Sequence, residues 1–346
     1  MSAPDIPAGD RRMAESYGGP RNGASAEAAV RLLAQLTGHG SGATAATLTP
    51  LEVLERGADQ PARLAPAAPL EGASIVRRPV AGSPDVRFTA FLDGIQRSLV
   101  LPQPRPTVPV VHGTVGAVIR ERADRALRTW GGDHVLDRAL YLPVARVEAA
   151  WVDAMRAAGF GIEDTSAASA DAVHPAEHLS AARDAVQRRR EAIEAALAGR
   201  WCAEGRGALY VDGGIAALGD AARGATVVGV VKSHRTAYVD GPSLEVVAAL
   251  PPGDRTTAFV VESRRRAHVA SWYLRLREGD GADPFSGIVR LEVAAGAFSP
   301  AHADDVSRWV LAEREPVALP DARWRVMAYG IRDCEAYLRA VAFRHG

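Results

Sequence analysis

The chain has 346 residues, enough for one large domain or two modest ones. Hydrophobic residues make up 47% of it and charged residues 24%, a balance that is typical of a globular protein and excludes a disordered or fibrous chain. Basic and acidic residues number 41 each, so no overall charge attracts a polyanion, and any nucleic-acid binding has to be local.

Cysteine usage and hydropathy predict where the protein works. The two cysteines, Cys202 and Cys334, are too few for a disulfide framework or a four-cysteine zinc site, which favours a reducing compartment. No apolar run is long enough to span a membrane, and the first residues lack the hydrophobic segment of an export signal. We therefore expect a cytoplasmic protein that binds no membrane.

The pattern predicts three parts along the chain. Residues 1–24 are rich in Gly, Pro and Arg without periodicity, which predicts a flexible arm. Residues 25–84 are predicted to form a helical and irregular N-terminal extension, with an amphipathic helix at 25–37 and a short helix at 51–57. The main domain is predicted to cover 85–346.

Strand patterns begin at residue 85. Three successive apolar runs within 85–122 predict an antiparallel meander, in which the first strand ends at an Asp-Gly turn and the third bends into a helix near Arg120. Helical pieces are predicted for 121–160, and a polar loop for 161–175.

The second half alternates helices and strands, which predicts a mixed α/β fold. A long helix at 180–201 has an apolar stripe of Val186, Ile193, Leu197 and Trp201. Strands are predicted at 207–214, 226–234, 257–263, 271–278 and 287–293, with a short helix at 214–223. The last helix, at 323–343, has a stripe of Met327, Ile331, Cys334, Leu338 and Val341.

Two aspartates occupy the same local setting. Asp93 and Asp212 each close an apolar strand and precede a glycine, and for either alone a plain turn is the alternative interpretation. If the two strands are neighbours, the carboxylates converge, and each raises the pKa of the other unless a cation neutralises them. Their hard oxygen ligands suit Mg²⁺ or Mn²⁺.

The helix before Asp212 offers a third acid, Glu191 or Glu194. Helical geometry places Glu194 about 80° from the middle of the apolar stripe and Glu191 about 140° away, so Glu194 borders the buried face. The alternative is that both side chains are solvated beside the helix's arginines. Arg190 falls inside the apolar stripe, which is an irregularity of the pattern.

Lys232 is the one lysine among the 41 basic residues. It follows a buried strand, where its ammonium has to reach water or an anion. Because a lysine is a compact point charge, a phosphate contact at the same sheet edge is predicted, with an ordinary strand-end cation as the alternative. The sequence has no phosphate-binding glycine loop, zinc-protease motif or serine-hydrolase motif.

The order of these pieces resembles a ribonuclease-H-like nuclease, and more closely the NurA nuclease domain family. The matching segments, within about 85–343, are FLDGIQRS, RREAIEAAL followed by LYVDGGI, VVGVVKSH, SWYLRL and GIVRLEV. The resemblance implies an α/β fold: a ribonuclease-H-like mixed sheet flanked by helices, with a helical insertion and an N-terminal extension.

The chain departs from the family at the last helix. The family usually has a Pro-containing segment leading into an Ala-His pair there, whereas this chain reads RWRVMAYGIRDCE. Tyr329 stands at the histidine position, with Asp333 one turn later and Glu335 beyond it. The identity of the fourth metal ligand is therefore open among these three, and a partly degraded site is a further alternative.

The resemblance implies a DNA nuclease that uses two Mn²⁺ or Mg²⁺ ions about 4 Å apart. Asp93 would bridge both ions, Glu194 and Asp212 would complete one side, and Asp333 the other. Substrate binding would fall to Lys232, Arg97, Arg235, Tyr329 and the arginines at 264–266. It further implies DNA end processing, repair or defence, a homodimer, and a HerA-like hexameric ATPase as partner.

Two other functions are consistent with the residues. One is a non-catalytic nucleic-acid-binding or assembly protein on the same fold. The other is a metal-dependent phosphatase that acts on small phosphate esters.

Overall fold

The computed structural model describes most of the chain in thirteen stretches. These are 20–21, 23–37, 48–51, 62–102, 107–123, 126–132, 134–166, 174–224, 226–262, 268–279, 281, 283–314 and 329–342, with side chains at 220–223 excepted. In these stretches, no helix has the length and apolar character needed to cross a membrane.

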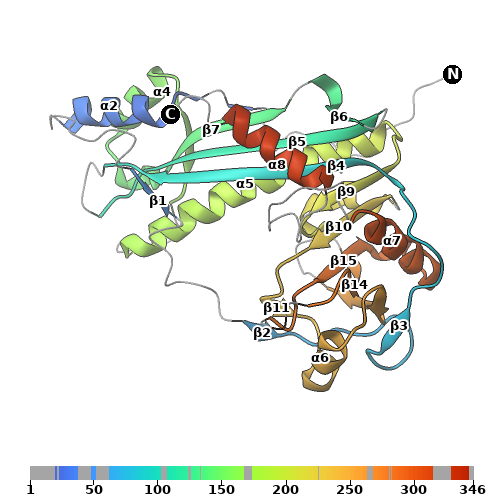
Figure 1. The fold of residues 1–346 in the computed structure, drawn as a ribbon. Coiled ribbons are helices and arrows are strands. Elements are labelled where there is room, and N and C mark those ends of the chain that lie inside the picture. The colour runs from blue at the N-terminus through green and yellow to red at the C-terminus, as the bar shows by residue number, and fades with distance from the viewer. Residues whose placement is uncertain are drawn as a thin grey trace, which may run out of the picture.

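Five strands form the centre of a large mixed sheet (Figure 1). Their spatial order is β7 (Val135–Leu142), β5 (Val111–Ala123), β4 (Phe88–Val100), β9 (Ala208–Asp212) and β10 (Val227–Val231). β5 runs antiparallel to β4 and β7, whereas β9 is parallel to β4 and β10 is parallel to β9. This arrangement, with helices on both faces, confirms the predicted ribonuclease-H-like α/β class.

The sheet continues on both sides of this centre. Beyond β10 come β15 (Ile288–Ala294), β14 (Val269–Arg275), β12 (Asp254–Thr256) and β3 (Arg77–Pro79), and beyond β7 comes β8 (Gly161–Asp164). Three strands pair at the side of this path: β1 (Thr49–Pro50), β6 (Ala126–Thr129) and β13 (Phe259–Val261). A separate ribbon contains β2 (Arg63–Leu64) and β11 (Thr236–Ala237).

Long helices cover the two faces of the central sheet. On one face, α5 (Pro175–Ala203) buries Val186, Ile193, Leu197 and Trp201 against β4 and β5, which confirms the predicted stripe. On the other, α8 (Tyr329–Ala342) lies across β4 and β5 and buries Ile331, Cys334 and Leu338 (Figure 1). α7 (Pro300–Ala312) packs on the same face.

Shorter helices complete the fold. They are α2 (Ala26–Thr37), α4 (Ala149–Ala157), α6 (Gly241–Ala248) and the 3-10 turns Trp130–Gly132, Val144–Arg146, Ala216–Arg223 and Ala295–Ala297. α2 confirms the first predicted helix, whereas 52–57 of the second, Met327 and most of the predicted arm lie outside the described residues. The division of the chain at residues 24 and 84 stays a prediction.

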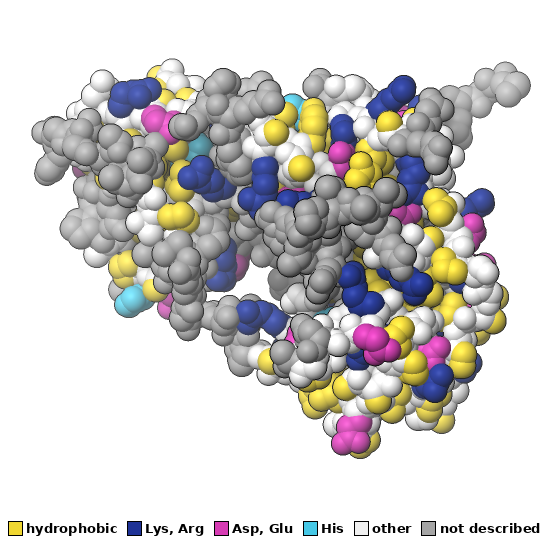
Figure 2. Space-filling model, viewed as in Figure 1, with side chains coloured by type: hydrophobic (Ala, Val, Ile, Leu, Met, Phe, Trp, Pro, Cys, Tyr) yellow, Lys and Arg dark blue, Asp and Glu magenta, His cyan; other side chains and the backbone are white. Residues whose placement is uncertain are grey.

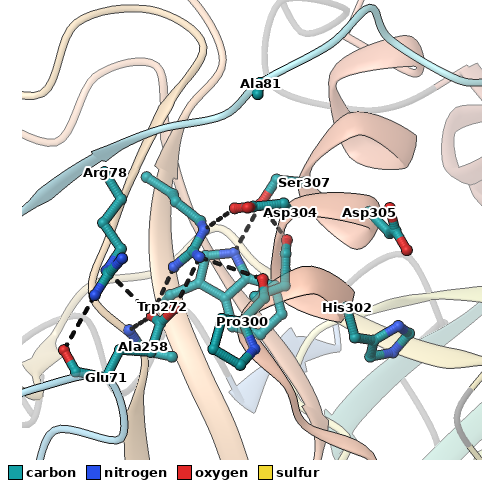
Figure 3. A network of polar contacts seen from close by, with 12 residues as sticks. Glu71, Arg78, Ala81, Ala258, Trp272, Pro300, His302, Asp304, Asp305 and Ser307 are labelled. Carbon is teal, nitrogen blue, oxygen red and sulfur yellow. Dashed lines mark hydrogen bonds and ion pairs between the residues drawn. The ribbon is translucent and has the colours of Figure 1, made fainter.

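A buried ion-pair network fastens the N-terminal extension to the rest of the fold (Figure 3). Arg255, 1% exposed on β12, donates to Glu71 from Nη1 at 2.7 Å and from Nη2 at 2.9 Å. Its Nε donates to Asp304 on α7 at 2.6 Å, and the Glu71 carboxylate also accepts from the Ala258 amide at 2.7 Å. One guanidinium thus joins the extension, the sheet and α7.

Several local predictions are wrong. The first strand does not end at Asp93: β4 runs on to Val100, because β5 pairs with it along this whole stretch. β5 likewise continues as a strand through Arg120 rather than bending into a helix. Within 121–160, predicted as helical, the chain forms β6 and β7, and helix α4 occupies only the end. The predicted loop at 161–175 contains β8, which pairs with β7.

Candidate active site

Asp93 and Asp212 are neighbours across two parallel strands. Leu92 on β4 is in register with Val211 on β9, so the two aspartates are the next residues on their strands. Asp93 lies opposite Val118 and Asp212 opposite Val230, and both partners belong to the core beneath α8. The two carboxylates therefore lie on the α8 face; Asp212 ends β9, as the sequence predicted, whereas Asp93 lies in the interior of β4.

The Asp93 carboxylate is buried among other acids. It is 8% exposed, and its Oδ1 accepts a hydrogen bond from the Gly94 amide at 2.8 Å. Burial raises the pKa of Asp93 well above its ordinary value, and the negative charges of Asp212 and Glu194 raise it further, against the opposing effect of Lys232. These three carboxylates thus share one electrostatic neighbourhood.

Glu194 reaches this neighbourhood from α5, on the opposite face of the sheet. Its side chain lies directly over Gly94, where an added Cβ would come within 2.1 Å of the Glu194 Oε1. Glycine after Asp93 therefore makes room for a close side-chain approach and does not form a turn. Burial raises the pKa of Glu194 to about 7; the charge of Arg190 lowers it, while Glu191 and Asp212 raise it.

The structure also separates the two glutamates that the sequence left open. Glu194 is 8% exposed. Glu191 is only partly buried and accepts a hydrogen bond from Gln187 Nε2 at 3.0 Å on the surface of α5. Glu194 is thus the helix acid that lies beside Asp93.

Lys232 follows β10 immediately and forms an ion pair with Asp212. Its Nζ lies 2.7 Å from Oδ1 and 2.8 Å from Oδ2 of that carboxylate. Val230, two residues earlier, is in register with Asp212, which explains why the lysine reaches it. The predicted association of the lone lysine with this sheet edge is present in the structure.

The three candidates on α8 lie in different surroundings. The Asp333 carboxylate is held by the guanidinium of Arg120 on β5. Glu335 pairs with Arg332 at 2.8 Å and with Arg339 at 2.7 Å along the helix. Tyr329, at the first position of the helix, is 43% exposed.

The start of α8 nevertheless packs closely on the strand that carries Asp93. A Cβ added at Gly330 would lie 2.1 Å from the ring of Phe91, and the Cys334 thiol donates to the Phe91 carbonyl at 3.4 Å. The structure therefore brings the helix to the site while Arg120 holds the Asp333 carboxylate.

Two predicted substrate-binding arginines follow the site residues closely in the sequence. Arg97 is exposed on β4, four residues beyond Asp93, and Arg235 is exposed three residues beyond Lys232. The triplet at 264–266 lies outside the described residues. On the face drawn in Figure 2, basic side chains are dispersed among acidic and apolar ones.

Two further charged groups lie near the acids: Arg190, which the sequence showed as an irregularity of the apolar stripe, and Glu292, which sequence reasoning missed. Arg190 donates from Nη1 to Glu194 Oε1 at 3.0 Å and from Nε to Gln96 Oε1 at 3.1 Å. Glu292 on β15 accepts from the Ile215 amide at 2.8 Å and so holds the loop that follows Asp212. The signals were a charge within the apolar stripe of α5 and a charge within an apolar strand.

The carboxylates of the site suit a hard divalent cation, but two of them already form ion pairs with basic side chains. Asp93, Asp212 and Glu194 offer carboxylate oxygens, the ligands that Mg²⁺ and Mn²⁺ prefer. Among the described residues, no group of three or more His, Cys, Asp or Glu side chains is arranged to hold a metal ion as it stands. Lys232 and Arg190 are the counter-ions of two of these acids, so a bound cation would have to replace them.

Comparisons with known proteins give remote structural similarity alone. No protein-family model matches the chain, and no curated protein matches it. Among solved structures, the chain is similar to the crystal structure of the NurA nuclease from Sulfolobus solfataricus, with 11% identity and a TM-score of 0.42 over 80% of this chain and 82% of that chain. The functional argument therefore rests on the site.

Proposed function

We propose that this protein is a divalent-metal-dependent nuclease that hydrolyses the phosphodiester bonds of DNA. The observation that carries the proposal is the proximity of Asp93, Asp212 and Glu194 where β9 ends beside β4, and burial and mutual repulsion there raise the pKa of Asp93. Repelling carboxylates in a buried place destabilise a fold, and a bound divalent cation relieves that repulsion.

Asp93, Asp212 and Glu194 would hold Mn²⁺ or Mg²⁺, and we propose two ions. When bound, such ions lower the pKa of an attacking water and stabilise the charge that develops on the leaving oxygen. The pKa of Asp93 responds to the charges of both Asp212 and Glu194, so we propose Asp93 as the bridging ligand. Asp333 is the proposed ligand of the second ion, and its ion pair with Arg120 would have to break before it could bind that ion.

The remaining residues bind and position the substrate. Lys232 would contact the scissile or adjacent phosphate once a metal ion takes its place at Asp212. Arg97 and Arg235 would follow the phosphate backbone through charge, without reading sequence. The exposed ring of Tyr329 would support a nucleotide beside the site.

The resemblance of the sequence motifs extends this proposal to partners. We propose a homodimer that acts with a HerA-like hexameric ATPase in DNA end processing, repair or defence in the cytoplasm. The motif order at Asp93, Glu194, Asp212 and Lys232 supports this part of the proposal.

A non-catalytic nucleic-acid-binding protein is the second candidate. It is favoured by the ion pairs Lys232–Asp212, Arg190–Glu194 and Arg120–Asp333, which engage three of the four proposed ligands. In such a protein these pairs would be permanent, and the acids would serve the fold.

DNA cleavage separates these functions. Labelled single- and double-stranded DNA is incubated with the wild type, Asp93→Asn and the control Asp184→Asn, in Mn²⁺, Mg²⁺ or chelator. Asp184 is exposed on α5 and pairs with Arg183, which makes it a matched surface carboxylate. Metal-dependent cleavage that Asp93→Asn abolishes and Asp184→Asn retains supports the nuclease.

Two outcomes would contradict the proposal. Salt-sensitive DNA binding by the wild type without cleavage in either metal would favour the assembly role. Turnover of small phosphate esters alone would favour a phosphatase. Because Asp93→Asn removes a buried charge, the variant is expected to fold, and its thermal unfolding checks this.

A further inference from the structure

Arg190 is the charged residue that interrupts the apolar stripe of α5, and it has two partners at the site. Its Nη1 donates to Glu194 Oε1 at 3.0 Å, and its Nε donates to Gln96 Oε1 at 3.1 Å. The Arg190 Cγ would lie 3.2 Å from a Cβ added at Gly94, so its stem lies along β4. A guanidinium is thus fixed between a carboxylate and a neutral amide on the α5 face of β4.

A cation bound at Glu194 would affect the two hydrogen bonds of Arg190 differently. A metal ion bound to Glu194 Oε1 would compete with the Nη1 hydrogen bond for the same oxygen and would place two positive charges together. Gln96 lies opposite Val115 on β5, on the α5 face. Because its amide is neutral, a cation bound at Glu194 would leave its hydrogen bond with Arg190 in place. Arg190 would therefore lose one partner and keep the other.

Release from Glu194 leaves the guanidinium without a counter-ion. Its side chain is 26% exposed, so the freed Nη groups lie at the border between the core and solvent, next to the acids. A planar fork of N–H donors fits the oxygens of a phosphate group. The group that best restores the lost negative charge is a phosphate of the substrate.

We propose that Arg190 is a substrate-positioning residue that exchanges Glu194 for a substrate phosphate when a divalent cation binds Glu194. This inference rests on the proposed metal-dependent function. In the metal-free protein Arg190 holds Glu194 as a replaceable counter-ion, and Gln96 keeps the guanidinium at the site during the exchange. Metal binding and phosphate binding thereby become coupled through one side chain.

Two binding measurements test the exchange. Calorimetric titration with Mg²⁺ alone, at about pH 8.5 so that protons compete little for the carboxylates, compares the wild type with Arg190→Gln. We expect Arg190→Gln to bind Mg²⁺ about tenfold more tightly, since no ion pair has to break, and to bind thymidine monophosphate about tenfold more weakly in saturating Mg²⁺. A loss of folding would lower both affinities, so a gain in the first cannot arise from it.

Two further variants serve as controls for Arg190→Gln. Arg188→Gln removes an exposed arginine of the same helix and is expected to match the wild type in both titrations. Arg190→Lys keeps the charge and is expected to restore wild-type Mg²⁺ affinity while recovering only part of the phosphate affinity, because it lacks the planar fork.

The outcomes distinguish this inference from the proposed function. If wild type and Glu194→Gln bind Mg²⁺ equally, or neither binds it, the proposed metal site is wrong. If Glu194→Gln loses Mg²⁺ but Arg190→Gln binds it no more tightly than the wild type, or binds the nucleotide unchanged, the exchange is overturned while the metal site stands.

Discussion

Gly94→Ala tests whether Glu194 belongs to the site. The new methyl group would lie 2.1 Å from Glu194 Oε1 and 3.1 Å from its Cδ, so the carboxylate has to leave its present position. The backbone itself accepts alanine, because Gly94 lies in a strand and its φ is not positive. The substitution therefore displaces one side chain with little change to the fold.

Opposing effects on stability nearly cancel in this variant. Alanine in a strand interior gains roughly 0.5–1 kcal/mol over glycine. Loss of the Arg190–Glu194 pair, an i,i+4 pair with the arginine first, costs about 0.5 kcal/mol. Moving a group that binds or orients a metal lowers metal affinity by about 10- to 100-fold. We therefore expect near-native unfolding together with a large loss of Mg²⁺ binding and DNA cleavage.

Gly116→Ala is the matched control. Gly116 lies on β5 opposite Ile95, and a Cβ there would have its nearest neighbour, the Val135 carbonyl oxygen, at 3.3 Å. Urea unfolding, Mg²⁺ titration and DNA cleavage are measured for both variants. Wild-type metal binding and cleavage by Gly94→Ala would refute the assignment of Glu194, and failure of the variant to fold would refute the packing argument.

Three further predictions concern charged side chains and their partners. The pKa of Glu194 is raised from 4.5 to about 7, so the free energy of unfolding of the metal-free protein falls as pH rises through this window, by on the order of 3 kcal/mol. Urea unfolding of Glu194→Gln should depend less on pH over the same range. Lys232→Met should lower DNA cleavage about 100-fold, because the lysine would contact phosphate, and should not weaken Mg²⁺ binding, because the Lys232–Asp212 pair no longer has to break. Unchanged cleavage would exclude the phosphate contact. Glu71→Ala should destabilise the protein by about 3 kcal/mol in urea, because Arg255 is left buried with one carboxylate partner fewer, and a near-wild-type midpoint would contradict this.

The sequence predicted the elements whose pattern is local. The apolar stripe of α5 was correct at Val186 and Ile193, because helical periodicity depends only on spacing. β7 was missed because Asp137 and Arg138 interrupt its apolar run. Asp137 is 1% exposed but is neutralised by Arg21 and Arg189, partners that are distant in the sequence.

The site was predictable where strand neighbours determine it. Asp93 and Asp212 converge because β4 and β9 are parallel and in register, which the order of elements suggested. The role of Gly94 was misread, since a turn and a close approach by Glu194 both select glycine. The pairing of Asp333 with Arg120 joins a helix to a strand far away in the chain, and no local pattern encodes it.

Anomalous diffraction from crystals grown with Mn²⁺ tests the central claim most directly. The account predicts manganese in contact with carboxylate oxygens of Asp93 and Asp212, with Glu194 turned towards it and the Lys232–Asp212 pair broken. Crystals grown with Mn²⁺ would contradict it if they contained no manganese at these carboxylates and kept the Lys232–Asp212 pair intact.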